Sequence, residues 1–100
     1  MKVLVDIGNT NVLMGKYDNS RLIDQVRFET NTVISSPNDI LKNLCIFLAK
    51  VEYVLISGVV PQAQKNLRIL ISKNFDNLSI RELNTSDLEA FIKFNVCLLY

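Results

Sequence analysis

The fold is decided by residues 3–11, VLVDIGNTN, near the amino-terminus. The unbroken apolar run at its start predicts a strand over residues 2–7 that is buried on both faces. The polar residues 9–11 then predict a turn, after which residues 12–17 return as a second strand. A further polar turn leads into a third strand over residues 21–30. The start of the chain is therefore expected to form an antiparallel meander of three strands.

Alternating helices and strands are expected after the meander. Ser36 before Pro37 predicts a helix start, because serine caps a helix N-terminus and proline fits the first helical position. We expect helices over residues 36–50, from Pro61 and from Ser86, and strands over residues 53–57, 79–83 and 95–100. The apolar faces of the two longer helices comprise Ile40, Leu44, Phe47 or Leu48, and Ala63, Leu67, Leu70 and Ile71. This order predicts an α/β fold, a mixed sheet flanked by helices.

The composition limits the classes of function. One hundred residues form one domain at most. Eleven Lys and Arg against ten Asp and Glu leave a net charge of +1, so there is no basic surface for nucleic acid or for an anionic membrane. No apolar stretch reaches the roughly 20 residues of a membrane span, and Asp6 comes too early for a secretory signal. We therefore expect a cytoplasmic protein that binds neither nucleic acid nor membrane.

Catalysis by imidazole and metal binding by thiolates are not expected. The sequence contains no histidine, which removes serine–histidine and cysteine–histidine catalysis and most zinc sites. The two cysteines, Cys45 and Cys97, are far apart and match no metal spacing. Each has large apolar neighbours, so we expect both to be buried free thiols.

The residues that follow the first strand suit a phosphate group. Phosphoryl transfer requires positioning and charge neutralisation around the phosphates. Gly8 lacks the Cβ that would keep a phosphate away from the backbone N–H groups of the turn, and Asn9, Thr10 and Asn11 add short polar side chains. Asp6, at the strand end, is placed to hold Mg²⁺ directly or through its waters. The alternative is a plain β-hairpin, because asparagine and glycine favour such turns without any ligand.

Three segments resemble the type III pantothenate kinases of bacterial coenzyme A biosynthesis. Residues 6–11, DIGNTN, resemble the first phosphate motif of that family, often D-[IV]-G-N-T-N. Residues 56–61, ISGVVP, resemble its I-S-S-V-V-P segment and depart from it at Gly58, where serine is usual. Residues 27–30, RFET, are more loosely similar to its R-x-x-T on the third strand. The resemblance implies the ribonuclease H-like fold of the actin-like, sugar-kinase-like ATPases, which agrees with the order of elements above.

The resemblance also implies an activity and its site. It implies transfer of the ATP γ-phosphate to the primary hydroxyl of pantothenate, with Mg²⁺, a monovalent cation such as K⁺ or NH₄⁺, and a homodimer. The ATP-phosphate site carried over from the family comprises Asp6, Ile7, Gly8, Asn9, Thr10, Asn11, Val12 and Leu13. In the family's pattern Asp6 is also the residue nearest the metal. Tyr100 is similar to a family tyrosine that lines the pantothenate pocket, although an ordinary apolar strand tyrosine is a nearly equal interpretation.

Other family motifs are absent from this sequence. The catalytic aspartate of the family stands in a G-x-D-R motif, and these 100 residues contain neither that motif, nor the second phosphate motif, nor the monovalent-cation ligands. The sequence also stops inside an apolar run, residues 94–100, where a natural terminus is uncommon. We therefore expect residues 1–100 to be the first nucleotide-binding domain of a longer protein, without a catalytic residue and without turnover of its own.

Alternative functions stay open at this point. A kinase of the same superfamily could act on another small-molecule acceptor, and a G-x-D-R motif further along would favour pantothenate. A non-catalytic relative could keep the fold as a regulatory or accessory protein, which loss of Mg²⁺-ATP binding without loss of folding would favour. A stand-alone interaction module is disfavoured by the apolar run at the end of the sequence.

Overall fold

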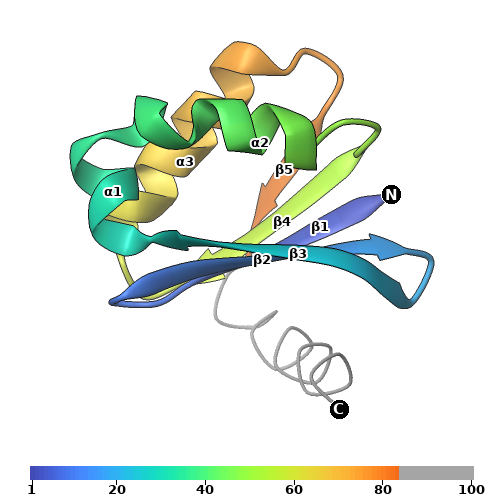
Figure 1. Ribbon diagram of the computed structural model, residues 1–100, viewed down its shortest axis with the longest axis horizontal. Helices are drawn as coiled ribbons and strands as arrows, with labels where there is room; N and C mark the ends of the chain where they lie inside the picture. Colours follow the sequence, from blue (N-terminus) through green and yellow to red (C-terminus); the bar gives the residue numbers. More distant parts are fainter. Residues whose placement is uncertain (84–100) are drawn as a thin grey trace.

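The architecture is a five-stranded mixed sheet with helices on one face (Figure 1). The computed structural model describes residues 1–83. The helix expected from Ser86, the strand expected over residues 95–100, Cys97 and Tyr100 lie outside the described residues. The predicted α/β class, a mixed sheet that begins with an antiparallel meander, is confirmed.

The sheet has the strand order β3-β2-β1-β4-β5. Its strands are β1 Lys2–Ile7, β2 Asn11–Asp18, β3 Arg21–Glu29, β4 Tyr53–Gly58 and β5 Ser79–Glu82. The first three strands form the antiparallel meander, whereas β4 pairs with β1, and β5 with β4, in parallel. The central strand β1 therefore has an antiparallel neighbour on one side and a parallel neighbour on the other.

The helices within residues 1–83 lie together on one side of the sheet (Figure 1). They are α1 Thr30–Ser35, α2 Leu41–Phe47 and α3 Pro61–Asn74, with a 3₁₀ helix, η1 Pro37–Ile40, between α1 and α2. Pro61 begins α3 as predicted, because its missing N–H would be unpaired at a helix start in any case. Among residues 1–83, no helix is long and apolar enough to cross a membrane.

The core lies between these helices and the face of the sheet beneath them. Val3, Val5 and Ile7 alternate along β1 toward this face and are almost fully buried. The helical positions predicted to face the sheet, Ile40, Leu44, Phe47, Leu48, Ala63, Leu67, Leu70 and Ile71, are all buried, which confirms the predicted spacing. A smaller cluster around Leu4 and Tyr17 lies on the other face, so β1 is buried on both faces at Leu4. Lys2 and Asp6 on that face are exposed, so the predicted burial on both faces holds only for the middle of the strand.

The segment between β3 and β4 differs from the prediction. Thr30, expected at the end of the third strand, begins the unpredicted helix α1. The single helix expected over residues 36–50 is divided into η1 and α2, and Ser36 makes no capping hydrogen bond with its side chain. α2 ends at Phe47, and the chain then turns through Lys50, whose φ of 66° lies in the left-handed region.

The expected burial of Cys45 is wrong, because this free thiol is exposed. Leu44 and Phe47 of α2 face the core. Consecutive residues of a helix point about 100° apart, so Cys45 and Ile46 lie on the outer side of α2, where Ile46 is 69% exposed. On a helix, apolar neighbours in the sequence do not predict burial, whereas the helical period does.

Candidate phosphate-binding site

The turn between β1 and β2 lies at the carboxyl end of the central strand. β4 runs parallel to β1 and ends beside it, with Asp6 in register with Ser57 and Ile7 with Gly58. Ligands of open α/β sheets bind outside the carboxyl ends of parallel strands. The structure therefore brings two of the sequence motifs, residues 6–11 and residues 56–61, together at the edge where a ligand is expected.

The turn is compact and presents unpaired backbone donors. The Gly8 N–H donates to the Asn11 carbonyl oxygen at 2.8 Å, and a Cβ on Gly8 would lie 3.2 Å from that oxygen, so glycine suits the tight closure. Asn9 and Thr10 are exposed. Within residues 1–83, no group accepts a hydrogen bond from the backbone N–H of Asn9 or of Thr10. Two successive amide donors are therefore free to bind an anion.

Two distant segments tie this turn to the rest of the domain. The Thr30 hydroxyl donates to the Gly8 carbonyl oxygen at 2.7 Å, and the Thr30 N–H donates to the Thr10 carbonyl oxygen at 2.9 Å. On the other side, the Val59 N–H donates to the Ile7 carbonyl oxygen at 3.1 Å. Sequence reasoning did not identify Thr30 as part of the site. The signal that could have found it was the RFET segment, whose last residue reaches back to the turn.

Gly58 is the point of closest approach between β1 and β4. A Cβ on Gly58 would lie 2.5 Å from Ile7 Cβ and 2.6 Å from the Ile7 carbonyl oxygen, well inside van der Waals contact. In this backbone a serine at residue 58 would therefore overlap β1. The departure from the family's usual serine coincides with a strand contact that only glycine permits.

Asp6 is the acidic group of the site. Its side chain is exposed at the carboxyl end of β1, beside the buried Ser57 on the same face of the sheet, and burial of part of the carboxyl raises its pKa above the ordinary 3.8. Burial disfavours the ionised form of the carboxyl. A divalent cation bound there would stabilise that ionised form by supplying the opposite charge. No role was predicted for Ser57, and its hydroxyl is the polar neighbour that the strand register supplies.

The polar groups of this site, one carboxylate and backbone N–H donors, suit Mg²⁺ bound together with phosphate better than a metal held by protein ligands alone. Within the described part of the chain, no three Asp, Glu or Cys side chains lie close enough together to hold a metal ion. Mg²⁺ retains several waters and is commonly bound by one or two carboxylates together with phosphate oxygens. Asp6 next to free backbone donors matches that pattern.

The remaining predicted site residues contribute in different ways. The side chains of Ile7 and Val12 are buried in the core, and Leu13 is half-buried, so their backbone rather than their side chains can line the site. Asp6 and the turn residues lie together, whereas Tyr100 is outside the described residues. The groups that can reach a ligand are therefore the Asp6 carboxyl and the polar groups of residues 8–11.

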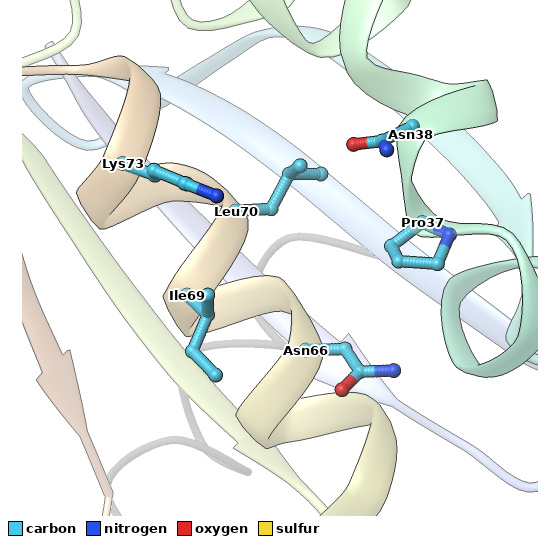
Figure 2. A pocket seen from close by; sticks show the side chains of 6 residues that line it. All are labelled: Pro37, Asn38, Asn66, Ile69, Leu70 and Lys73. Atoms are coloured by element: carbon cyan, nitrogen blue, oxygen red, sulfur yellow. The ribbon is translucent and has the colours of Figure 1, made fainter.

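A surface hollow elsewhere carries no comparable chemistry. It lies between η1 and α3, has a volume of about 130 Å³ and is lined by Pro37, Asn38, Asn66, Ile69, Leu70 and Lys73 (Figure 2). Its lining includes one cationic group, Lys73, and no acid. Asn66 uses its side-chain amide for hydrogen bonds within the protein. We therefore place the candidate site at the β1–β2 turn.

The sheet order and the helices match the actin-like fold. The structure resembles the crystal structure of an Aquifex aeolicus member of the Ppx/GppA protein family with a TM-score of 0.53, at 15% sequence identity, over 92% of this chain and 38% of that chain. At this identity the likeness concerns the fold alone.

The sequence determines the family. The model of the type III pantothenate kinase family matches residues 2–97, and the chain belongs to that family. It is 33% identical over 81 residues to the type III pantothenate kinase of Myxococcus xanthus, covering 75% of this chain and 32% of the relative. It is 26% identical over 103 residues to type III pantothenate kinase 1 of Francisella tularensis, covering 90% of this chain and 40% of the relative. The chain thus spans a third to two fifths of the length of these relatives.

Proposed function

We propose that this chain supplies the ATP-phosphate- and Mg²⁺-binding part of a kinase that phosphorylates pantothenate to 4′-phosphopantothenate, the first step of coenzyme A biosynthesis. The observation that supports the proposal is the pair of unpaired backbone N–H groups at Asn9 and Thr10, next to the Asp6 carboxyl at the carboxyl edge of β1. Family membership supplies the acceptor, pantothenate, and the donor, ATP.

The proposed chemistry is positioning and charge neutralisation. Phosphoryl transfer spreads negative charge over the oxygens of the transferred group, so fixed donors and a metal ion stabilise its transition state. The N–H groups of Asn9 and Thr10 would donate to phosphate oxygens, and the Asp6 carboxylate would hold Mg²⁺ directly or through its waters. Because these donors are fixed by the fold before ATP arrives, little reorganisation is needed when the nucleotide binds.

Further parts of the proposal concern groups outside the described turn. A G-x-D-R aspartate would act on the pantothenate hydroxyl, so we propose that residues 1–100, the first nucleotide-binding domain, do not turn over pantothenate alone. A monovalent cation such as K⁺ or NH₄⁺, a homodimer and a cytoplasmic location belong to the same proposal. Tyr100 is proposed for the pantothenate pocket by its resemblance to the family tyrosine.

The experiment is a titration of the ¹⁵N-labelled 100-residue chain with ATP, with and without Mg²⁺, followed by amide chemical shifts. We expect saturable shifts of the Asn9 and Thr10 amides that strengthen with Mg²⁺. The amides of Asn19 and Ser20, in the other turn of the meander, serve as internal controls and should not move. Unchanged Asn9 and Thr10 resonances at millimolar Mg²⁺-ATP would contradict the proposed phosphate role and would favour a non-catalytic accessory protein.

A further inference from the structure

α1 is held in place by tertiary contacts rather than by its own sequence. Four of its six residues, TNTVIS, are β-branched, and a fifth is asparagine, and such residues are weak helix formers. Asn66 of α3 donates through Nδ2 to the carbonyl oxygens of Val33 at 3.1 Å and of Ile34 at 3.0 Å, near the end of α1. Gln62 in turn donates to Asn66 Oδ1 at 2.8 Å. The carboxyl end of α1 is thus fixed to α3.

The amino end of α1 is fixed to the turn. Thr30 is 1% exposed, and its hydroxyl and its N–H hold the carbonyl oxygens of Gly8 and Thr10. A short helix that is anchored at one end by Asn66 and at the other by Thr30 gives the turn a rigid support. The hydrogen bond from the Thr30 hydroxyl to Gly8 joins residues 22 apart in the sequence. It therefore depends on the tertiary fold and not on the β1–β2 hairpin alone.

The Thr30 hydroxyl holds the carbonyl of the peptide that also carries the Asn9 N–H. The Gly8 carbonyl and the Asn9 N–H belong to one planar trans peptide, so they point in opposite directions. Because the carbonyl is held toward the buried Thr30, the N–H is directed away from it, and no described residue accepts its proton. Gly8 has no Cβ to restrict its ψ, so without the hydroxyl this peptide could rotate and present the carbonyl oxygen instead.

We propose that Thr30 is the positioning residue of the phosphate-binding turn: its hydroxyl fixes the Gly8–Asn9 peptide so that the Asn9 N–H faces the nucleotide phosphate. This inference rests on the proposed function, because it names the residue that sets the geometry of the same site. A rotated peptide would direct a carbonyl oxygen at an anion, and repulsion would replace a hydrogen bond. Thr30 touches no phosphate itself and acts through the Gly8–Asn9 peptide.

The test compares variants that differ by the hydroxyl. Thr30→Val keeps the shape and removes the donor, and Thr30→Ser keeps the donor. Thr32→Val is the matched control, because it makes the same substitution on α1 at a side chain that forms no hydrogen bond with the turn. Each ¹⁵N-labelled chain is titrated with Mg²⁺-ATP, and the Asn9 and Gly8 amides are followed together with amides of the core strands, which report folding.

We expect Thr30→Val to weaken Mg²⁺-ATP binding about three- to tenfold, the effect of losing one hydrogen bond, and to shift the Asn9 amide resonance before any nucleotide is added. Thr30→Ser and Thr32→Val should stay within about twofold of the unmodified chain. Equal binding by folded Thr30→Val, with an unchanged Asn9 resonance, would overturn the positioning role while leaving the proposed function intact.

Two further outcomes are equally decisive. If Thr30→Val does not fold, the pair Thr30→Ala and Thr30→Ser repeats the comparison without the added methyl group, and equal affinities in that pair would overturn the inference. If the unmodified chain shows no Asn9 or Thr10 shift with Mg²⁺-ATP, the proposed function fails and the positioning role fails with it. Failure of the proposed function is seen in the unmodified chain, whereas failure of the positioning role alone is seen only in the Thr30 variants, so the two results are distinguishable.

Discussion

The two turns of the β-meander are built differently, although both join neighbouring antiparallel strands. The β1–β2 turn is held by Thr30 and by the approach of β4, both distant in the sequence, and it leaves backbone donors free. The β2–β3 turn consists of exposed residues, and Asn19 adopts a φ of 57° that closes it locally. They lie at opposite ends of β2 (Figure 1).

The difference separates a turn that is closed by its own residues from a turn that is also held by distant segments. Asn19 closes its turn by visiting the left-handed region, which asparagine tolerates, and no distant segment is needed. Gly8 has no positive φ, and its turn instead relies on hydrogen bonds from other elements. Composition alone does not distinguish them, since both turns contain asparagine beside small polar residues. The tertiary hydrogen bonds do.

The largest expected effect is a loss of turnover on substitution of Asp6, which flanks the first turn, compared with Asp18, which flanks the second. In a full-length kinase that carries this segment, Asp6→Asn should lower pantothenate-dependent ADP release on the order of a hundredfold or more, because a metal ion supplies several kcal/mol of charge stabilisation. Asp18→Asn, beside the other turn, should leave turnover nearly unchanged. Near-normal turnover in Asp6→Asn would remove the functional distinction between the turns.

The same substitution should not destabilise the protein. Burial raises the pKa of Asp6 above its unfolded value, so the folded state holds the proton more tightly, and stability from this group is lost as the pH rises through the raised pKa. At pH 7 the ionised carboxyl therefore opposes folding, and Asp6→Asn should melt at the same temperature or slightly higher by circular dichroism. A clear fall in melting temperature would show that loss of activity reflects loss of structure.

An intermediate effect concerns the strand contact that ties the first turn to β4. Gly58→Ala should reduce the free energy of unfolding by about 1–3 kcal/mol, because the new Cβ overlaps the backbone of Ile7. Gly15→Ala is the comparison in β2, since its Cβ would meet side-chain atoms of Tyr17 and Leu22 rather than the backbone of a neighbouring strand. Urea denaturation measures both variants, and an equal or smaller loss in Gly58→Ala would contradict the close approach of β1 and β4.

The smallest effect is expected in the second turn. Asn19→Ala should reduce the free energy of unfolding by about 1 kcal/mol, because alanine is less favourable at positive φ, and Asn19→Gly should be close to neutral. Neither variant should alter the shifts of the Asn9 and Thr10 amides with Mg²⁺-ATP. A change in those shifts would show that the two turns are coupled through β2.

The strands and α3 were predictable because their signals are local. The apolar run of β1, Pro61 at the start of α3 and the helical spacing of Leu67 and Ile71 each depend on neighbouring residues, and the structure confirms them. The position of the candidate site followed from the same local signals, since the polar turn comes directly after β1.

The features that sequence reasoning missed depend on distant partners. α1 has weak helix formers and exists because Asn66 and Thr30 anchor its ends, which no local pattern reveals. The same residue, Thr30, was assigned to a strand because it continues the polar and apolar alternation of β3. Gly58 was noted only as a departure from a motif, and its reason became visible when β4 was placed beside Ile7.

The position of β1 between an antiparallel and a parallel neighbour has a consequence for the order of folding. The β1–β2 hairpin closes from residues close in sequence, and such hairpins form within microseconds. Pairing of β1 with β4 must wait for a long crossover that includes α1, η1 and α2. In a growing chain the hairpin can therefore close early, but an isolated hairpin is only marginally stable. The turn reaches the shape that it has in the folded domain only after Thr30 and Val59 have emerged and docked.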